Sequence, residues 1–259
     1  MMANRNNLLF RKLKMALGIA ALAASQQAAA DVIELNNFWA GHGSAVIDFT
    51  GIDWHTGATV TGLHEHGGSG GFKTYNLTTD PARQDSFQSW CVDIFHNFSF
   101  SVQSQDTLKP ANIALAGSSA TLPTSFSQKA ADDLARLYTN HHSAVDSKSS
   151  TGANESAFQL AVWEIVNERS GTYSLGNGNF RATGTGSSTA AIWLSELATP
   201  SASKYSANIW TVQMTLSTGK GYAQDVVVFS PVPEPETYAM LLAGLGLLSF
   251  TARRRKQSA

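Results

Sequence analysis

The segment NESAFQLAVWEIVNE, Asn154–Glu168, repeats apolar residues with the period of an α-helix. Phe158, Ala161, Val162 and Ile165 fall on one face when the segment is wound as a helix. Such a face is stabilised mainly by packing against other elements. We therefore predict a helix in the middle of the chain, with this face directed toward the core of the domain.

Two neighbouring segments, residues 125–142 and 187–197, also place apolar residues at helical spacing. The apolar residues of the first are Ala130, Leu134, Leu137 and Tyr138, and those of the second are Trp193, Leu194 and Leu197. We predict one helix in each segment, so that the middle of the chain is mainly helical.

Segments with the character of strands lie before and after these helices. They mix aromatic and β-branched residues, some with a period of two, and they cover residues 44–49, 71–77, 97–102, 208–216 and 224–230. Strands on both sides of a helical middle indicate an α+β fold. We predict a β-sandwich or barrel that carries helical excursions.

Residues 1–30 have the plan of a secretory signal peptide. Basic residues precede an apolar run, Met15–Ala24, and Ala28–Ala30 fits a cleavage site for small residues. The apolar run is too short to span a bilayer as a mature helix, and an N-terminal anchor is the alternative. We predict that the mature chain begins at Asp31 and that the protein is exported.

The other end of the chain, residues 231–259, combines three elements. The first is an extended motif made stiff by its prolines, and it consists of Val232, Pro233, Glu234 and Pro235. An apolar segment, residues 238–252, follows it. Residues 253–256 are all basic, and such a cluster stays on the cytoplasmic side of a membrane.

This tail resembles the PEP-CTERM sorting signal of Gram-negative bacteria. The resemblance implies recognition by an exosortase-type membrane enzyme and an intermediate in the inner membrane. It also implies removal of the tail and delivery to the cell surface or the extracellular polymer matrix. An ordinary tail anchor is the alternative, and it places the domain on the same outer side of the inner membrane.

Between these ends, residues 31–230 suffice for one domain with its own core. The whole chain has a formal net charge of −1. Residues 31–230, however, carry 10 lysines and arginines against 17 aspartates and glutamates, which gives a net charge of −7. This acidic balance argues against a nucleic acid as the partner.

The segment SFQSWCVDIFHNFSF, Ser86–Phe100, contains the only cysteine of the chain, Cys91. A single cysteine excludes an internal disulfide framework. In an exported protein it indicates an intermolecular disulfide or a reactive thiol. The alternative is a buried thiol that acts as a small hydrophobic side chain.

Gln159 is the second unusual residue, because it lies between Phe158 and Leu160 in the apolar helix. A buried amide without a partner costs about 1–3 kcal/mol, so this side chain needs one. A local partner is available, since Ser156 and Gln159 fit the pattern of a capping box at a helix N-terminus.

The two segments WCVD and FQLAVW together resemble the thioester domains of bacterial surface adhesins. The residues that match the cysteine motif of this family are Trp90, Cys91, Val92 and Asp93. Those that match its Thr-Gln-x-Ala-Val/Ile-Trp motif are Gln159, Ala161, Val162 and Trp163. Phe158 stands where threonine is usual in the family.

The resemblance implies an intramolecular thioester between the Cys91 sulfur and the side-chain carbonyl of Gln159, within a thioester-type surface domain that spans residues 31–230. Asp93 is expected to relay protons or to orient the backbone. The side chains expected to exclude water from the bond are Trp90, Phe95, Phe158 and Trp163.

A thioester is an acyl electrophile that an amine can attack. The amine would come from a partner's lysine, a polyamine or an amino sugar, and it would form an amide with Gln159 and release Cys91. Each molecule reacts once, so we expect a covalent adhesin that is not an enzyme and needs no cofactor. A noncovalent structural component of the extracellular matrix is the alternative, with Cys91 in the core and Gln159 as a cap.

His64 and His66 lie in the segment TGLHEHGGSGG, residues 61–71. Two histidines at positions i and i+2 of a strand can bind a metal, and a metal-binding module is therefore a third possible function. We favour a glycine-rich loop with solvated histidines and predict no metal site.

Overall fold

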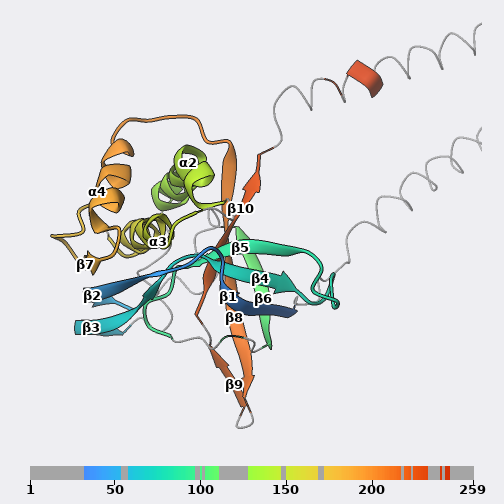
Figure 1. Ribbon diagram of the computed structural model, residues 1–259, viewed down its shortest axis with the longest axis horizontal. Helices are drawn as coiled ribbons and strands as arrows, with labels where there is room; N and C mark the ends of the chain where they lie inside the picture. The colour runs from blue at the N-terminus through green and yellow to red at the C-terminus, as the bar shows by residue number, and fades with distance from the viewer. Residues whose placement is uncertain are drawn as a thin grey trace, which may run out of the picture. The chain divides into compact units, whose positions relative to one another are not determined.

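The computed structural model describes residues 32–53, 58–96, 100, 103–110, 128–146, 150–168, 172–216, 219–222, 224–232, 240 and 243–245. Over these residues the chain forms an α+β domain with two antiparallel sheets (Figure 1). The predicted signal peptide, residues 1–30, and the motif residues Pro233, Glu234 and Pro235 lie outside the described residues.

Strands come first and last in the chain, and the helices lie between them. The strands are β1 (Val32–Phe38), β2 (Gly43–Ile52), β3 (Thr59–Ser69), β4 (Phe72–Asn76), β5 (Ser86–Cys91), β6 (Gln103–Pro110), β7 (Phe180–Gly184), β8 (Tyr205–Leu216), β9 (Gly219–Tyr222) and β10 (Val226–Pro231). The helices are α2 (Gln128–Val145), α3 (Gly152–Asn167) and α4 (Ser187–Glu196).

Six strands of the larger sheet close on themselves. The order β10-β5-β4-β1-β6-β8 returns to its start because β10 also pairs with β8, and β9 extends the sheet beyond β8. The closing contact between β10 and β5 is short, with Val226 opposite Cys91 and Val227 opposite Trp90. The predicted alternatives were a sandwich and a barrel, and this pairing makes the larger sheet a small barrel.

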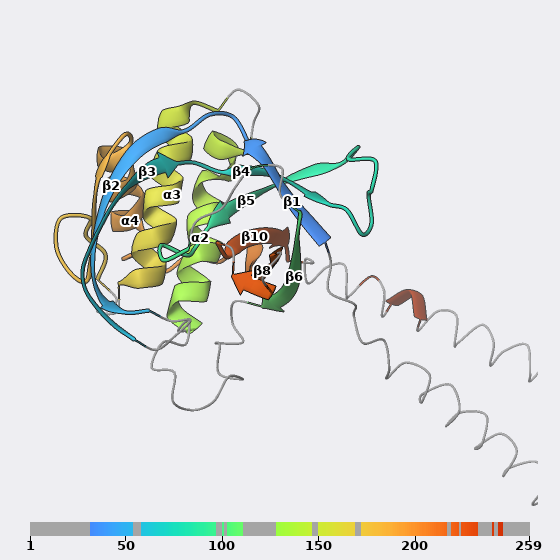
Figure 2. The same ribbon diagram turned by 90° about the horizontal axis from the view of Figure 1, so that it is seen from below.

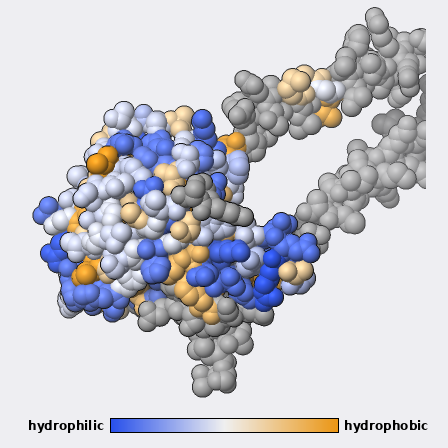
Figure 3. Space-filling view, in the orientation of Figure 1, coloured by the Kyte–Doolittle hydropathy of each residue, from blue (hydrophilic) through white to orange (hydrophobic). Residues whose placement is uncertain are grey.

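The smaller sheet has the order β3-β2-β7 and curves around one side of α3 (Figure 2). The other two helices and β5 contact α3 from further directions. Helix α3 is therefore the element on which the two sheets and the helices meet. The outer side of the smaller sheet faces water, and on the face shown in Figure 3 hydrophilic residues predominate over β2 and β3.

Helix α3 begins after Thr151, whose side-chain hydroxyl accepts a hydrogen bond from the Asn154 N–H at 3.2 Å. Ser156 lies inside the helix, so the capping-box alternative for Gln159 is wrong. Its hydroxyl instead donates to the Thr185 carbonyl at 2.6 Å. The local pattern could not reveal this because the true cap lies five residues earlier.

The burial of α3 also exceeds the prediction of a single apolar face. Twelve of its residues are buried, because the smaller sheet covers the side that a surface helix would leave in water. The polar residues Glu155, Gln159 and Glu164 are consequently buried together with the apolar ones. Each of them must find a partner inside the protein.

The three predicted helices are confirmed, as are the strands predicted at residues 44–49, 71–77 and 224–230. The strand predicted at residues 208–216 forms most of β8. Of the strand predicted at residues 97–102, only Phe100 is described, and it lies in a turn. Strand β5 ends at Cys91, so the residues that follow it do not continue the pleat.

The prediction of a glycine-rich loop around His64 and His66 is also wrong. Both histidines lie in β3, which pairs with β2 over its whole length. Asp48 is directly opposite His64 in this pairing. Pairing with a long neighbouring strand outweighs the low strand propensity of the glycines.

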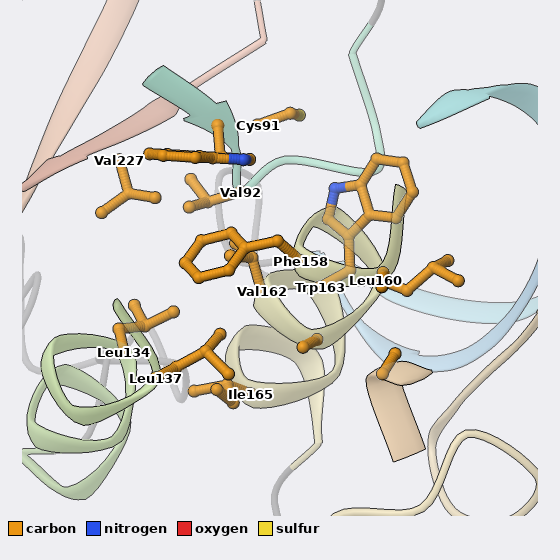
Figure 4. Packing of buried hydrophobic residues seen from close by; sticks show 14 of the residues in the cluster. Cys91, Val92, Leu134, Leu137, Phe158, Leu160, Val162, Trp163, Ile165 and Val227 are labelled. Carbon is orange, nitrogen blue, oxygen red and sulfur yellow. The ribbon is translucent and has the colours of Figure 1, made fainter. Parts of the chain in front are cut away.

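Aromatic side chains fill the space between α3 and the closed sheet. The ring of Phe158 lies 4.7 Å from that of Trp90, and Tyr138 stacks on Phe229 at 4.2 Å. Figure 4 shows Phe158 between β5 and helix α2, where Leu134 and Leu137 lie. Phe158 thus joins the helical layer to the sheet, in keeping with its place on the predicted apolar face.

Two buried carboxyl groups of α3 have few partners. Glu164 accepts a hydrogen bond from the Ser174 N–H at 2.6 Å, and burial raises its pKa to about 8. Glu155 accepts from the Gly71 N–H at 3.2 Å and from Gln88 Nε2 at 3.0 Å, and burial raises its pKa to about 7. Burial therefore shifts both groups toward the protonated form, and the shift is larger for Glu164.

At the C-terminal end of the domain, Val232 follows β10, and its N–H donates to the Lys204 carbonyl at 2.9 Å. Among the residues that the structure describes, no helix is both long and apolar enough to cross a membrane.

Stability should fall as the pH rises, because the folded protein holds protons that the unfolded chain releases. Glu164 has an ordinary pKa of 4.5 and a folded pKa of about 8, so the loss should extend from about pH 4.5 to pH 8. Chemical denaturation at several pH values measures it. Glu164→Gln should reduce the dependence of the free energy of unfolding on pH and stabilise the protein at pH 8. Glu65→Gln, at an exposed position of β3, should leave this pH dependence unchanged. A slope that is the same in all three proteins would contradict the prediction.

Candidate functional site

Cys91 is the last residue of β5 and lies at the short contact that closes the larger sheet. Its side chain is 1% exposed, and Trp90 and Val92 on either side are equally buried. The Val92 N–H donates to the Asp225 carbonyl at 2.9 Å, which continues the contact with the chain entering β10. The cysteine is therefore held by backbone pairing on its β10 side.

On the other side of Cys91, the side chain of Gln159 takes the place of a neighbouring strand. The Cys91 N–H donates to Gln159 Oε1 at 3.1 Å, and Gln159 Nε2 donates to the Cys91 carbonyl at 2.6 Å. These two bonds join residues 68 positions apart in the sequence. A side-chain amide that pairs with both backbone groups of one residue imitates the peptide unit of a strand.

The place is free because β4 begins too late to fill it. Its first residue, Phe72, lies opposite Ser89, so a longer β4 would place Gly70 opposite Cys91. Instead the Gly71 N–H turns to the Glu155 carboxylate. Gln159 is 1% exposed and satisfies the two backbone groups that this departure leaves open.

The Cys91 thiol donates to the Asp93 carbonyl at 2.8 Å. Burial raises the pKa of the thiol well above its ordinary value, and the negative charges of Asp93 and Asp225 add to this effect. Trp163 and the backbone contact with Asp93 oppose the shift without cancelling it. The resting form of Cys91 at neutral pH is therefore the protonated thiol.

The aromatic residues predicted to exclude water from the bond differ in what they contact. Trp90, Phe158 and Trp163 are all buried, and Figure 4 shows the indole nitrogen of Trp163 on the side of its ring nearer Cys91. Phe95 is half-buried and meets Phe49 edge to face at 5.4 Å. Trp163 thus interacts with the Cys91 thiol, whereas the ring of Trp90 packs on Phe158.

Asp93 is fully buried in the turn that follows β5. Its carboxylate accepts hydrogen bonds from the Phe95 N–H and from His96 Nδ1, both at 2.7 Å. This contact raises the pKa of His96. Asp93 contacts the Cys91 thiol through its backbone carbonyl, and its side chain orders the turn. Its predicted roles in proton relay and backbone orientation stay predictions.

Two neighbours of the site were not predicted from the sequence. Gln224 Nε2 donates to the Asp93 carbonyl at 3.0 Å, and Asp225 is fully buried beside Val92. Both precede β10, and only the closing of the sheet brings them to Cys91. The one available signal was a charged residue directly before the apolar run VVVF.

Residues 231–256 match the PEP-CTERM protein-sorting motif. The chain carries an exosortase sorting signal. It identifies an exported protein that passes through a membrane-associated intermediate and is processed by an exosortase-type enzyme. Its destination is the cell surface or the extracellular space. The match includes Val232, Pro233, Glu234 and Pro235 and the basic cluster predicted from the sequence. No curated protein matches the chain.

Gln159→Ala should lower the free energy of unfolding by several kcal/mol, because each of the two orphaned backbone groups of Cys91 costs about 1–3 kcal/mol. Urea denaturation measures the loss. Cys91→Ala keeps both backbone groups paired and should cost less. Gln224→Ala removes a single hydrogen bond from a half-buried glutamine and serves as the matched control. Equal losses in Gln159→Ala and Cys91→Ala would show that the two hydrogen bonds are not what Gln159 contributes.

Glu234→Ala should impair recognition of the sorting signal, because it changes the central residue of the Pro-Glu-Pro motif. In a bacterium with an exosortase, the variant should accumulate in the membrane fraction with its tail uncut. Cell fractionation and the mass of the C-terminal peptide measure this. Glu196→Ala, in α4, is the control and should be processed like the wild type. Normal processing of Glu234→Ala would contradict the prediction.

Proposed function

We propose that Cys91 and Gln159 form an internal thioester and that the exported domain uses it to capture amines covalently. The observation that carries the proposal is the pair of hydrogen bonds between the Gln159 amide and the Cys91 backbone. They hold the amide carbon beside the residue that bears the thiol. Groups held in this way gain effective molarities of about 10⁵–10⁸ M when well oriented.

The reaction adds the Cys91 sulfur to the side-chain carbon of Gln159 and expels ammonia. The thiol proton leaves with the ammonia, so no oxidant or cofactor is needed. The hydrogen bond from Gln159 Nε2 to the Cys91 carbonyl is lost with this nitrogen, whereas the bond from the Cys91 N–H to Oε1 remains. Negative charge develops on Gln159 Oε1 during the attack. The Cys91 N–H already donates to this oxygen at 3.1 Å and can stabilise that charge. A fixed donor of this kind stabilises a tetrahedral intermediate.

The protonated thiol makes the reaction slow, because the attacking species is the thiolate. Water is also excluded, since both residues are 1% exposed, and this protects a thioester from hydrolysis. An incoming amine reaches the bond only when the surrounding side chains move. Small amines should therefore react faster than bulky ones.

Capture joins Gln159 to the amine of a partner and frees Cys91. Protein lysines, polyamines and amino sugars all carry a suitable nucleophile. Each molecule reacts once, so the protein acts as a covalent adhesin and not as an enzyme. The closed sheet with its helical layer would then be a thioester-type domain, delivered to the outside of a Gram-negative cell by the sorting signal.

A noncovalent role in the extracellular matrix is the second candidate, and one observation favours it. Both the oxygen and the nitrogen of the Gln159 amide are hydrogen-bonded to the Cys91 backbone, and the thiol donates to Asp93. Both residues thus have structural partners without a covalent bond. In this role the domain is a passive component of a biofilm matrix.

The intact mass of the purified protein separates the two functions. The wild type should be lighter than the mass calculated from its sequence by one ammonia, whereas Cys91→Ala and Gln159→Ala should each have their full calculated mass. Gln88→Ala, at a buried glutamine of β5, is the matched control and should still lose ammonia. Incubation with methylamine should replace the lost ammonia by one methylamine in the wild type.

Full mass in the wild type, with a thiol that reacts only after unfolding, would overturn the thioester and favour the noncovalent role. A thioester that hydrolyses during purification leaves a carboxylic acid at position 159. A peptide mass distinguishes this acid from the original amide. Loss of ammonia in Cys91→Ala would reveal a different internal bond.

A further inference from the structure

A pair of imidazoles lies on the exposed surface of β3. His64 and His66 are two positions apart on this strand, so their side chains share one face of the smaller sheet. Their Nε2 atoms are 3.1 Å apart, and the ring centroids are 4.9 Å apart with an interplanar angle of 81°. Two nitrogen atoms therefore converge on one point outside the sheet.

Asp48 on β2 determines which ring nitrogen of His64 carries the proton. It lies opposite His64 in the strand pairing, and its Oδ1 is 2.7 Å from His64 Nδ1. A carboxylate here keeps the proton on Nδ1, so the lone pair of His64 lies on Nε2 and faces His66. Histidines that bind metals are commonly held in this way by a carboxylate on the other ring nitrogen.

We propose that His64 and His66 form a surface site for a divalent transition metal that imidazoles favour, such as Zn²⁺ or Cu²⁺. A metal with bonds of about 2.0–2.1 Å to two nitrogens separates them by about 2.9 Å at a right angle and about 3.3 Å at a tetrahedral angle. The observed 3.1 Å lies between these values. Metal binding then replaces the contact between the nitrogens by two metal bonds, and the proton that His66 Nε2 shares with His64 moves to His66 Nδ1.

The surroundings determine how strong the site can be. Over the described residues there is no group of three or more metal-ligating side chains, so the remaining positions belong to water. The side chain of His64 is 56% exposed and that of Asp48 is 44% exposed, which leaves room for those waters. Arg181 lies opposite Asp48 on β7 and brings a positive charge, so the site should bind its metal reversibly.

The proposal does not rest on the thioester. The two histidines lie on the smaller sheet, whereas Cys91 lies at the closing contact of the larger one. Loss of Cys91 should leave metal binding unchanged.

Isothermal titration calorimetry of the full chain with Zn²⁺ tests the site. His64→Gln and His66→Gln should each weaken Zn²⁺ binding by at least about tenfold, and Asp48→Asn should weaken it by about 10–100-fold through the loss of the positioning contact. His42→Gln is the matched control, because His42 is also exposed but lies outside the pair. Thermal unfolding of each variant without metal establishes that it is folded.

Electron paramagnetic resonance with one equivalent of Cu²⁺ adds a readout that does not depend on affinity. Two nitrogen ligands are expected in the wild type and in His42→Gln, and one in His64→Gln or His66→Gln. No Zn²⁺ binding at millimolar concentration would overturn the proposal. It would equally be overturned if the two histidine variants bound Zn²⁺ as tightly as His42→Gln.

Discussion

Before any thioester forms, the pairing of the Gln159 amide with the backbone of Cys91 joins helix α3 to the end of strand β5. Strand β5 pairs with β10 on one side, and this pairing closes the larger sheet. On its other side the pairing with β4 ends at Ser89, two residues before Cys91. Buried backbone groups without partners are costly, so something must supply a donor and an acceptor there. The amide of a helical side chain does so, and it fixes α3 against the sheet at the same point.

Helix α3 is buried over twelve of its sixteen residues. The smaller sheet covers the part of the helix that the closed sheet does not, and the polar residues of α3 lose their access to water as a result. Glu155, the first carboxyl, accepts from the backbone just before β4. Gln159 pairs with the backbone at the end of β5. The second carboxyl, Glu164, is left with a single hydrogen-bond partner among the described residues. Its pKa is consequently raised further than that of Glu155.

The two proposed chemistries occupy opposite environments of one exported domain. A thioester needs the dry surroundings of Cys91, where burial keeps the thiol protonated and shields it from solvent oxidants. A reversible metal site needs water as additional ligands, and the exposed strand β3 provides this. The sorting signal accounts for why both belong to a protein that functions outside the cell.

The helices, several strands and the sorting signal could be read from the sequence, because helical period, strand period and the Pro-Glu-Pro tail are all local patterns. Cys91 and Gln159 could be singled out because a lone thiol and a glutamine in an apolar helix are locally unusual. Their actual contact is decided by the tertiary structure, since it arises where β4 ends and β5 must still be paired. The position of Asp225 beside Val92 is likewise tertiary, because the two residues are far apart in the sequence. The capping of α3 was missed because the local pattern placed the start of the helix at Ser156 and not after Thr151. The glycines around His64 and His66 indicated a loop. The pairing of β3 with β2 instead forms a strand and brings the two Nε2 atoms together. Backbone hydrogen bonds to a neighbouring strand here outweigh the preference of single residues.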